Sequence, residues 1–173
     1  MLQKLTLVLG GASSGKSAFA ENIVIKSGYT RIYLATSQAW DDEMKEKIQK
    51  HIQQRGKGWK TVEAPLDLTE VLAAVKKKEV LLLDCATMWL TNHLLADHDL
   101  KAESKRLLKA LKDCKGHVVV VSNEVGLSVV PENALARRFR DAQGTLNQQL
   151  AARADTVVAV MAGLPLALKG TLP

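Results

Sequence analysis

The segment GGASSGKS near the amino end constrains the fold more than any other part of the sequence. Its first glycine is followed by four residues and then by Gly15, Lys16 and Ser17, which fits the pattern GxxxxGK[ST]. The apolar run Leu5–Leu9 precedes the motif, and a helical pattern over Lys16–Lys26 follows it. A glycine- and serine-rich turn can match such a pattern by chance, but the flanking strand and helix favour a phosphate-binding loop.

The phosphate loop predicts which groups would surround a nucleotide. Successive backbone N–H groups and the amino end of the following helix attract phosphate oxygens. We expect Lys16 to reach the β- and γ-phosphates and the Ser17 hydroxyl to bind Mg²⁺. A second acid is expected after a neighbouring buried strand, where Asp84 follows Val80–Leu83. The alternative is that Asp84 is a turn residue that ends the strand, and Glu124 is a rival carboxylate.

Strand and helix patterns alternate along the chain. Apolar or alternating runs predict further strands at Arg31–Ala35, Lys60–Glu63, Glu79–Leu83, His117–Val121, Thr156–Met161 and Leu164–Leu168. Helical patterns occupy Asp41–Arg55, Leu68–Lys77, Ala86–Ala96, Ala102–Leu111 and Glu132–Ala152, with an interruption expected near Gly144. This order predicts an α/β fold of the P-loop NTPase (RecA-like) class, with three layers and a mostly parallel central sheet flanked by helices. No repeat or linker is evident, so we expect residues 1–173 to form a single nucleotide-binding catalytic domain.

The net charge and the distribution of basic residues bear on which partners the protein binds. The formal net charge is +6, which fits either a lysine-rich solvated surface or attraction of anionic ligands. The basic residues are dispersed and no aromatic platform accompanies them, so we expect no nucleic-acid partner.

Cys85 and Cys114 stand outside any CxxC pair, which predicts reduced thiols in a cytoplasmic protein, with a disulfide as the alternative. No signal peptide or membrane-spanning run is evident.

One predicted helix face carries a histidine beside a cation. Met44, Ile48, His51 and Arg55 follow one another at steps of four, three and four residues, so they share a face. A neutral imidazole can attack an activated phosphoryl or nucleotidyl group, and an arginine can pair with phosphate oxygens in a forked geometry. By itself, the spacing favours a partly exposed histidine beside two apolar neighbours, without a catalytic role.

The segment SNEVGLSVVPENALARRFRDAQGTLNQQLAARAD follows another buried strand. Asn123 and Glu124 end this strand, which is where ligand groups usually lie in an open α/β sheet. Arg137, Arg138 and Arg140 then crowd one stretch of the following helix. This stretch fits a solvated amphipathic helix with internal ion pairs, and it also fits a contact with substrate or with another subunit.

Together these segments resemble one enzyme family. From its first strand to Lys169, the chain is similar to the bifunctional adenosylcobinamide kinase / adenosylcobinamide-phosphate guanylyltransferase family of cobalamin biosynthesis. The similarity is carried by GGASSGKS, ATSQ with DDEM, LLLDCATMWLTN, SNEVG, VPEN, RRFRD, GTLNQQLAARAD and AGLPLALK. The resemblance implies that ATP or GTP phosphorylates the aminopropanol hydroxyl of adenosylcobinamide. It further implies transfer of GMP from GTP, through a guanylyl-histidine, to give adenosylcobinamide-GDP and pyrophosphate.

The resemblance also assigns roles to residues. His51 takes the position of the family's guanylylated histidine, and His51 and Lys16 are the implied catalytic residues. The implied nucleotide contacts are Gly10, Gly11, Ala12, Ser13, Ser14, Gly15, Lys16, Ser17, Ala35, Thr36, Ser37, Ile52, Gln53, Gln54, Arg55, Glu63 and Asp84. Ser17 and Asp84 are the implied ligands of Mg²⁺. The implied partners are GTP, ATP, adenosylcobinamide and its phosphate, and a homo-oligomer, in the form of a trimer, is expected.

The chain departs from the usual pattern of the family at two positions. Ser13 and Lys47 stand where the family commonly carries arginine. Loss of an arginine removes a forked phosphate contact that neither serine nor lysine fully replaces. Both departures therefore bear on the relative strength of the two activities, and neither removes the nucleophile or the loop lysine.

A phosphate loop by itself does not define a reaction, so three other activities fit this sequence. The first is a different small-molecule kinase of the same fold, in which His51 is merely structural. The second is a RecA-like motor, which would bind nucleic acid with strong salt dependence. The third is a nucleotide sensor that binds GTP without turnover.

Overall fold

The computed structural model describes residues 2–38, 42, 45–46, 49, 53 and 55–173. Its centre is a seven-stranded sheet in the order β3-β2-β4-β5-β1-β6-β7. The strands are β1 (Leu5–Gly10), β2 (Thr30–Ala35), β3 (Trp59–Glu63), β4 (Glu79–Asp84), β5 (His117–Asn123), β6 (Thr156–Met161) and β7 (Leu164–Lys169). Neighbouring strands are parallel except β6 and β7, which form an antiparallel hairpin at one edge. The predicted mostly parallel sheet is therefore confirmed, and the strand predicted at Leu164–Leu168 lies at its edge.

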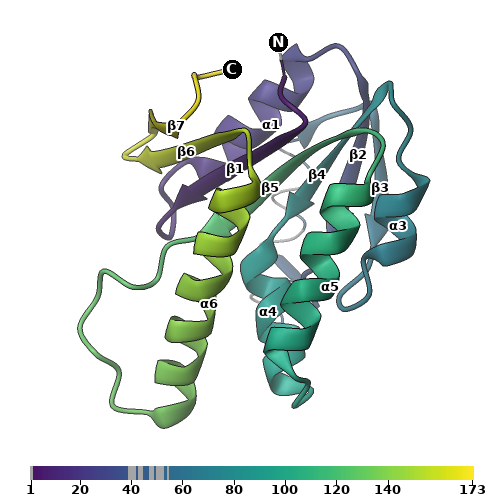
Figure 1. Ribbon diagram of the computed structural model, residues 1–173. Coiled ribbons are helices and arrows are strands. Elements are labelled where there is room, and N and C mark those ends of the chain that lie inside the picture. The colour runs from purple at the N-terminus through teal and green to yellow at the C-terminus, as the bar shows by residue number, and fades with distance from the viewer. Residues whose placement is uncertain (1, 39–41, 43–44, 47–48, 50–52, 54) are drawn as a thin grey trace.

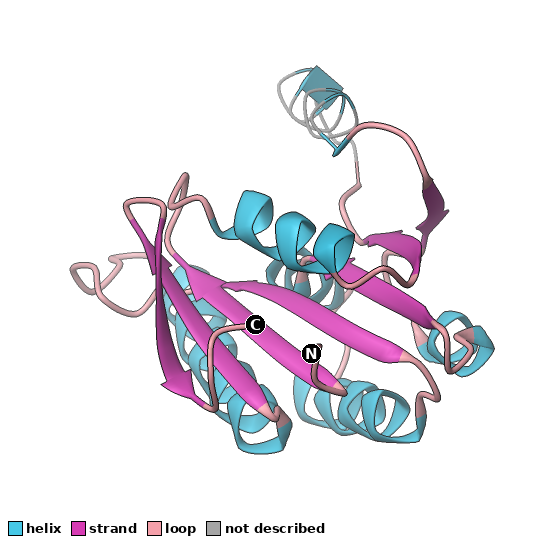
Figure 2. Cartoon of the chain, turned by 90° about the horizontal axis from the view of Figure 1, so that it is seen from above, coloured by secondary structure: helices cyan, strands magenta, loops and turns pink. Residues whose placement is uncertain are grey.

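Helices cover both faces of the sheet and complete three layers (Figure 1). They are α1 (Lys16–Lys26), α3 (Thr69–Ala74), α4 (Ala86–Leu95), α5 (Leu100–Asp113) and α6 (Ala134–Arg153). Viewed from above in Figure 2, α1 lies on one face of the sheet and the other four lie on the opposite face. The helix predicted from Asp41 to Arg55 falls largely outside the described residues.

Side-chain alternation along the strands divides the core in two. In β4, Leu81 and Leu83 belong to the cluster under α3 to α6, whereas Val80 and Leu82 belong to the cluster under α1. β5 alternates in the same way. Because successive side chains of a strand point to opposite faces, a continuous aliphatic run fills both halves of the core. This is why the central strands are readable from sequence as uninterrupted Val and Leu.

Two of the predicted helices differ from the structure in more than a shift of one or two residues at their ends. The predicted interruption near Gly144 is wrong, because α6 runs unbroken through this glycine. The helix buries Leu146 and Leu150 against the sheet, and this packing outweighs the cost of one glycine, about 1 kcal/mol. The predicted helix up to Lys77 is also too long, because α3 ends at Ala74. Beyond it, the backbone N–H of Lys76 donates to the carboxylate of Glu79, which forms a turn into β4.

A buried polar network joins α6 to the end of β5. The Ser122 hydroxyl donates to Asn147 Oδ1 over 2.7 Å, and Gln143 Nε2 donates to both of these oxygens over 2.9 Å. Asn147 Nδ2 donates in turn to the Asn123 carbonyl over 3.0 Å. From the other side, the Asn123 N–H donates to the Thr87 hydroxyl of α4. Two helices thus fix the backbone where β5 leaves the sheet.

Both cysteines are free thiols, which confirms the expectation of no disulfide between them. Burial, followed by the nearby Asp84 carboxylate, raises the pKa of Cys85 to about 12.

Within the described part of the chain, no helix combines the length and the hydrophobicity needed to cross a membrane.

We expect Asn147→Ala to destabilise the protein by about 2 kcal/mol, since it leaves buried groups of Ser122 and Asn123 without their partner. Urea unfolding followed by circular dichroism measures the change. Gln148→Ala, on the exposed side of the same helix, serves as the matched control and should cost less than about 0.5 kcal/mol. Equal losses in both variants would contradict a stabilising role for the network.

Candidate active site

The parallel register brings separately predicted site residues to one edge of the sheet. Gly10, the last residue of β1, pairs with Asn123 of β5. Ala35, the last residue of β2, pairs with Asp84 on one side and with Glu63 on the other. The carboxyl ends of five strands therefore lie along one line, which is the usual ligand edge of an open α/β sheet.

The phosphate loop has the backbone geometry that anion binding requires. Gly15 adopts the left-handed region at φ 91° and directly precedes the first turn of α1. The Lys16 ammonium donates to the Gly11 carbonyl over 3.0 Å, so it folds back over the loop. A side chain at Gly10 would place a Cβ 2.3 Å from Ser14 Oγ and 2.7 Å from the Val160 carbonyl oxygen. Only glycine fits there, because a Cβ cannot approach other atoms that closely.

The β6–β7 hairpin supports the phosphate loop from outside. The Gly163 N–H donates to the Ser14 carbonyl over 2.8 Å. A Cβ at Gly15 would lie 3.1 Å from Gly163 Cα, so the two glycines make close backbone contact. The sequence analysis did not assign Gly163 to the site. The glycine in its AGLP segment predicts a turn there, but the contact itself spans almost 150 residues and is not readable locally.

The loop opens into a cleft of about 790 Å³ between the β6–β7 hairpin and the segment that follows β5. Glu124, the rival carboxylate, lines this cleft, and its Oε1 accepts a hydrogen bond from the Gly126 N–H over 2.6 Å. Apolar side chains including Leu127, Met161 and Leu168 form much of the remaining wall. A ligand in this cleft would meet the phosphate loop at one end and apolar surface at the other.

A charged cluster lies next to Asp84, on the α1 side of the sheet. The Tyr33 hydroxyl donates to Asp84 Oδ2 over 3.1 Å. The Arg55 guanidinium carbon lies 3.2 Å from the centre of the Tyr33 ring, a cation–π contact. Glu21 of α1 completes the cluster, and both it and Arg55 are buried. Among the described residues, Glu21 Oε1 and Arg55 Nη1 have no hydrogen-bond partner, so polar atoms there are available to a ligand.

Burial, followed by the Asp84 carboxylate, raises the pKa of Glu21 to about 7, although the Arg55 guanidinium opposes this shift. Burial and the same carboxylate also raise the pKa of Tyr33, which therefore keeps its proton. The sequence analysis missed Glu21. A local signal existed, because Glu21 follows Ser17 by four residues and so shares its helix face.

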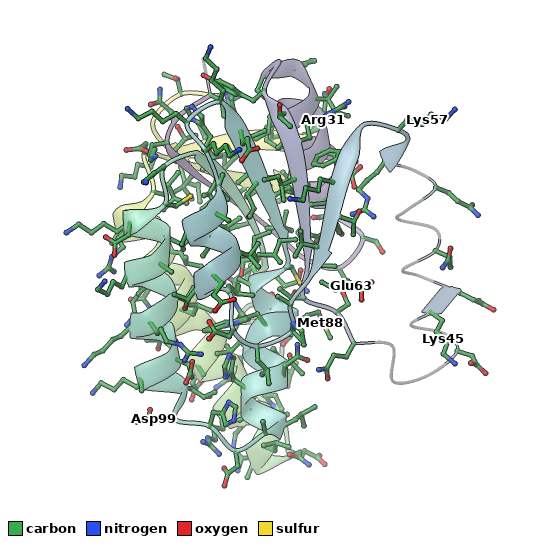
Figure 3. The ribbon with its side chains drawn as sticks, turned by 90° about the vertical axis from the view of Figure 1, so that its right-hand side faces the viewer. Arg31, Lys45, Lys57, Glu63, Met88 and Asp99 are labelled. Atoms are coloured by element: carbon green, nitrogen blue, oxygen red, sulfur yellow. The ribbon has the colours of Figure 1, made fainter. Side chains whose placement is uncertain are left out.

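The remaining residues implied by the resemblance divide into three groups. Thr36 is buried, and its hydroxyl donates to the Cys85 carbonyl over 2.7 Å while accepting from the Cys85 N–H, so it braces the loop after β2. Glu63 is exposed, and Figure 3 shows it at the same end of the sheet as Met88 of α4. Gln53 is also exposed. His51, the catalytic residue that the resemblance implies, lies outside the described residues, as do Ile52, Gln54 and Lys47.

The arginine-rich start of α6 is held mainly by local contacts. Arg140 forms an ion pair with Asp141 at 3.1 Å, and Arg137 donates to the carbonyl oxygens of Pro131 and Glu132. Arg138 Nη1 lies 3.9 Å from Asp97 Oδ1 in the turn between α4 and α5. These contacts favour the interpretation of this stretch as a helix surface with internal ion pairs.

The fold and the loop together define the class of the protein as a P-loop NTPase of the RecA-like kind. Two solved structures share this architecture. The RadB recombinase aligns with a TM-score of 0.53 over 90% of this chain and 73% of its own, at 17% identity. An ATPase from the type III secretion system of pathogenic bacteria gives a TM-score of 0.55 over 95% of this chain and 56% of its own, at 14% identity. At these identities the likeness shows the fold alone.

Sequence comparison then defines the family. The profile described as cobinamide kinase / cobinamide phosphate guanyltransferase matches residues 6–168. The bifunctional adenosylcobalamin biosynthesis protein CobP of Pseudomonas aeruginosa is 44% identical over 167 residues, covering 95% of this chain and 96% of that protein. Its counterpart CobU of Escherichia coli is 42% identical over 181 residues, covering 95% and 99%. The chain therefore belongs to the cobinamide kinase / cobinamide phosphate guanyltransferase family of bifunctional enzymes in cobalamin biosynthesis, as the motifs predicted.

The raised pKa of Glu21 predicts a pH-dependent stability. Because the pKa in the folded state lies above the ordinary value of 4.5, the wild-type protein loses stability as pH rises from about 4.5 through 7. Glu21→Gln cannot ionise, so its stability relative to wild type should be about 2 kcal/mol more favourable at pH 8 than at pH 5. Urea unfolding of the nucleotide-free protein at both values measures this, with the exposed Glu70→Gln as control. If the stability difference between Glu21→Gln and the wild type is the same at both pH values, the raised pKa of Glu21 is contradicted.

Proposed function

We propose that this enzyme phosphorylates the aminopropanol hydroxyl of adenosylcobinamide, with ATP or GTP as donor, and then transfers GMP from GTP to the new phosphate. The products of the second step are adenosylcobinamide-GDP and pyrophosphate. Membership in the family is the observation that carries this proposal. We propose further that residues 1–173 act as one catalytic domain, because the strands of the described residues all belong to a single sheet.

We expect the phosphate loop to bind the nucleotide in both reactions. Its N–H groups and the amino end of α1 would bind phosphate oxygens, and the Lys16 ammonium would exchange the Gly11 carbonyl for them. Ser17 and Asp84 supply a hydroxyl and a carboxylate, the hard oxygen ligands that suit Mg²⁺. Bound there, Mg²⁺ would offset negative charge on the phosphates.

Each proposed step exchanges one bond to phosphorus for another. In the kinase step, the substrate oxygen bonds to the γ-phosphorus, the bond to the nucleoside diphosphate breaks, and the hydroxyl proton is released. In the guanylyl step, a ring nitrogen of His51 bonds to the α-phosphorus of GTP and pyrophosphate leaves. The phosphate of the corrinoid then displaces the histidine. Arg55, four residues after His51, supports this scheme because the charged cluster anchors it beside Asp84.

Incubation of the protein with adenosylcobinamide, ATP, GTP and Mg²⁺ tests the reaction sequence. We expect mass analysis of the corrinoid to detect first the phosphate and then the GDP derivative. His51→Ala should stop at the phosphate and should lose labelling by [α-³²P]GTP by at least about 100-fold, since no nucleophile remains. His117→Ala is the matched control, because His117 stacks on Tyr29 at 4.5 Å and contacts the Gln3 carbonyl. Robust labelling of the His51 variant would remove this residue from its role.

We also propose that the protein is a homo-oligomer, in the form of a trimer, that uses the β6–β7 hairpin as a contact surface. β7 is an edge strand, and edge strands readily contact other chains. It presents Leu164, Leu166 and Leu168 with exposed fractions of 72%, 59% and 58%. Leu127 and Val129 of the neighbouring segment are each 90% exposed. Such a concentration of exposed apolar side chains supports a protein contact.

The double variant Leu166→Glu/Leu168→Glu tests this surface. Charges on the hairpin should prevent association, so light scattering is expected to give the chain mass of 18.9 kDa in place of about three times that value. Ile25→Glu places the same charge on an exposed apolar residue of α1 and should leave the oligomer intact. An unchanged mass in the double variant would exclude the hairpin as the contact.

A further inference from the structure

Three metal-ligating side chains converge where α4 turns into α5, apart from the residues of the nucleotide site. His93 lies in the last turn of α4, His98 in the connecting turn, and Glu103 near the start of α5. The Nδ1 atoms of the two histidines are 2.8 Å apart. Glu103 Oε2 lies 4.0 Å from His93 Nε2, and one ligand atom of each residue lies within 4.8 Å of the others.

The hydrogen bonds of His93 leave one of its ring nitrogens available as a ligand. Nε2 contacts the Leu66 carbonyl at 3.2 Å, and a carbonyl only accepts, so Nε2 carries the proton. Nδ1 of the neutral ring is then a lone pair directed at His98. His93 is 1% exposed, so the packing around it holds its ring in this orientation. Metal-binding histidines characteristically donate their other N–H to a carbonyl or a carboxylate in this way.

We propose that His93, His98 and Glu103 bind one late first-row divalent cation, with Zn²⁺ as the best fit. His93 Nδ1, His98 Nδ1 and a carboxylate oxygen of Glu103 are the three protein ligands, and water completes a tetrahedron. The cation replaces the proton that His98 Nδ1 now shares with His93. Zinc–nitrogen bonds of about 2.0–2.1 Å place tetrahedral ligands roughly 3.3 Å apart. Ligand atoms of the three side chains already lie within 4.8 Å of one another, so Glu103 must approach the histidines by up to about 1.5 Å to close the site.

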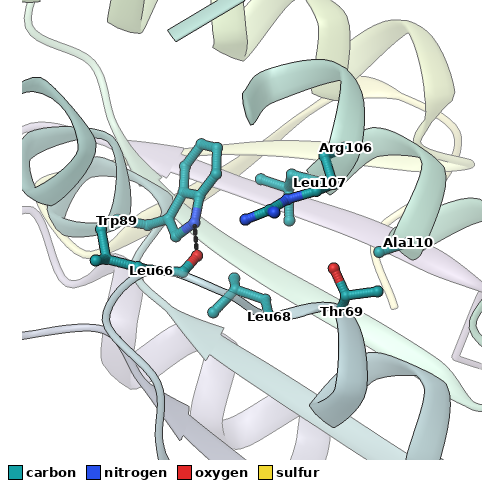
Figure 4. A pocket seen from close by; sticks show the side chains of 7 residues that line it. All are labelled: Leu66, Leu68, Thr69, Trp89, Arg106, Leu107 and Ala110. Atoms are coloured by element: carbon teal, nitrogen blue, oxygen red, sulfur yellow. Dashed lines mark hydrogen bonds between the residues drawn. The ribbon is translucent and has the colours of Figure 1, made fainter. Parts of the chain in front are cut away.

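Arg106 competes with the cation for Glu103. Its Nη2 lies 2.9 Å from Glu103 Oε2 and 3.9 Å from Asp67 Oδ2. Figure 4 shows Arg106 reaching from α5 towards Trp89 and Leu66. This side chain is about half exposed, so it can turn into solvent when a cation arrives. Removal of Arg106 should therefore tighten cation binding, whereas loss of a ligand should weaken it.

The proposed site would brace the helix that supports the carboxyl edge of the sheet. Leu66 accepts hydrogen bonds from Trp89 Nε1 over 2.8 Å and from His93. Next to His93, Asn92 Nδ2 donates to the carbonyls of Thr36 and Pro65. A cation that ties the end of α4 to α5 would hold these contacts together.

Titration of the chelator-treated, nucleotide-free protein with Zn²⁺ and Co²⁺ tests the proposal. We expect one equivalent to bind, with the visible bands of tetrahedral Co²⁺, and Zn²⁺ at 100-fold above its Kd to raise Tm by about 5 °C. His98→Gln and Glu103→Gln should each weaken binding at least about tenfold, and Arg106→Gln should strengthen it. His117→Gln controls for histidine content, and Mg²⁺, which prefers oxygen ligands, should give no shift.

Circular dichroism without metal establishes whether each variant folds. If one of the two ligand variants does not fold, the other still tests the site. The proposal is overturned when the wild-type protein binds no Zn²⁺. It is also overturned when folded His98→Gln and Glu103→Gln bind as tightly as wild type, or when His117→Gln loses binding to the same extent. Retention of the site in His117→Gln together with its loss in both ligand variants would establish it.

Discussion

The parallel hydrogen-bond ladder through β2, β4, β5 and β1 is the constraint on which the rest of the structure depends. It places Gly10 opposite Asn123 and Ala35 opposite Asp84, so that chain segments distant in sequence end at one edge. The phosphate loop, Glu63 and Asp84 then lie at or just beyond that edge. The continuous aliphatic strands make this register rigid, because each contributes side chains to both halves of the core.

The polar interior beside Asp84 has a cost that the core must offset. Glu21, Tyr33 and Arg55 are all buried, and two of them retain polar atoms without a hydrogen-bond partner among the described residues. Burying charge in this way destabilises a fold, as the elevated pKa of Glu21 shows. Strongly perturbed groups that gather beside a phosphate loop are typical of functional sites rather than of packing. A bound nucleotide and its cation would supply the partners that these groups lack.

The β6–β7 hairpin both supports the phosphate loop and exposes apolar side chains. On its inner side, Gly163 holds the phosphate loop through the Ser14 carbonyl, so the loop conformation depends on the far end of the chain. The leucines of β7 remain exposed, and Leu168 among them lines the cleft. The same hairpin also forms one wall of the cleft beside the loop. Association through this surface would thus take place next to the site of chemistry.

The sequence by itself determined the fold class, the phosphate loop and the family. Each rests on local pattern: glycines at fixed spacing before a helix, uninterrupted aliphatic strands, and motifs such as SNEVG. Only the tertiary structure decided that α6 continues through Gly144, that Gly163 donates to the phosphate loop, and that the charges of Arg55 and Asp84 act on Glu21. These features depend on packing between segments far apart in the chain. Local propensity carries no information about such contacts, because their energies arise only once the sheet has brought the segments together.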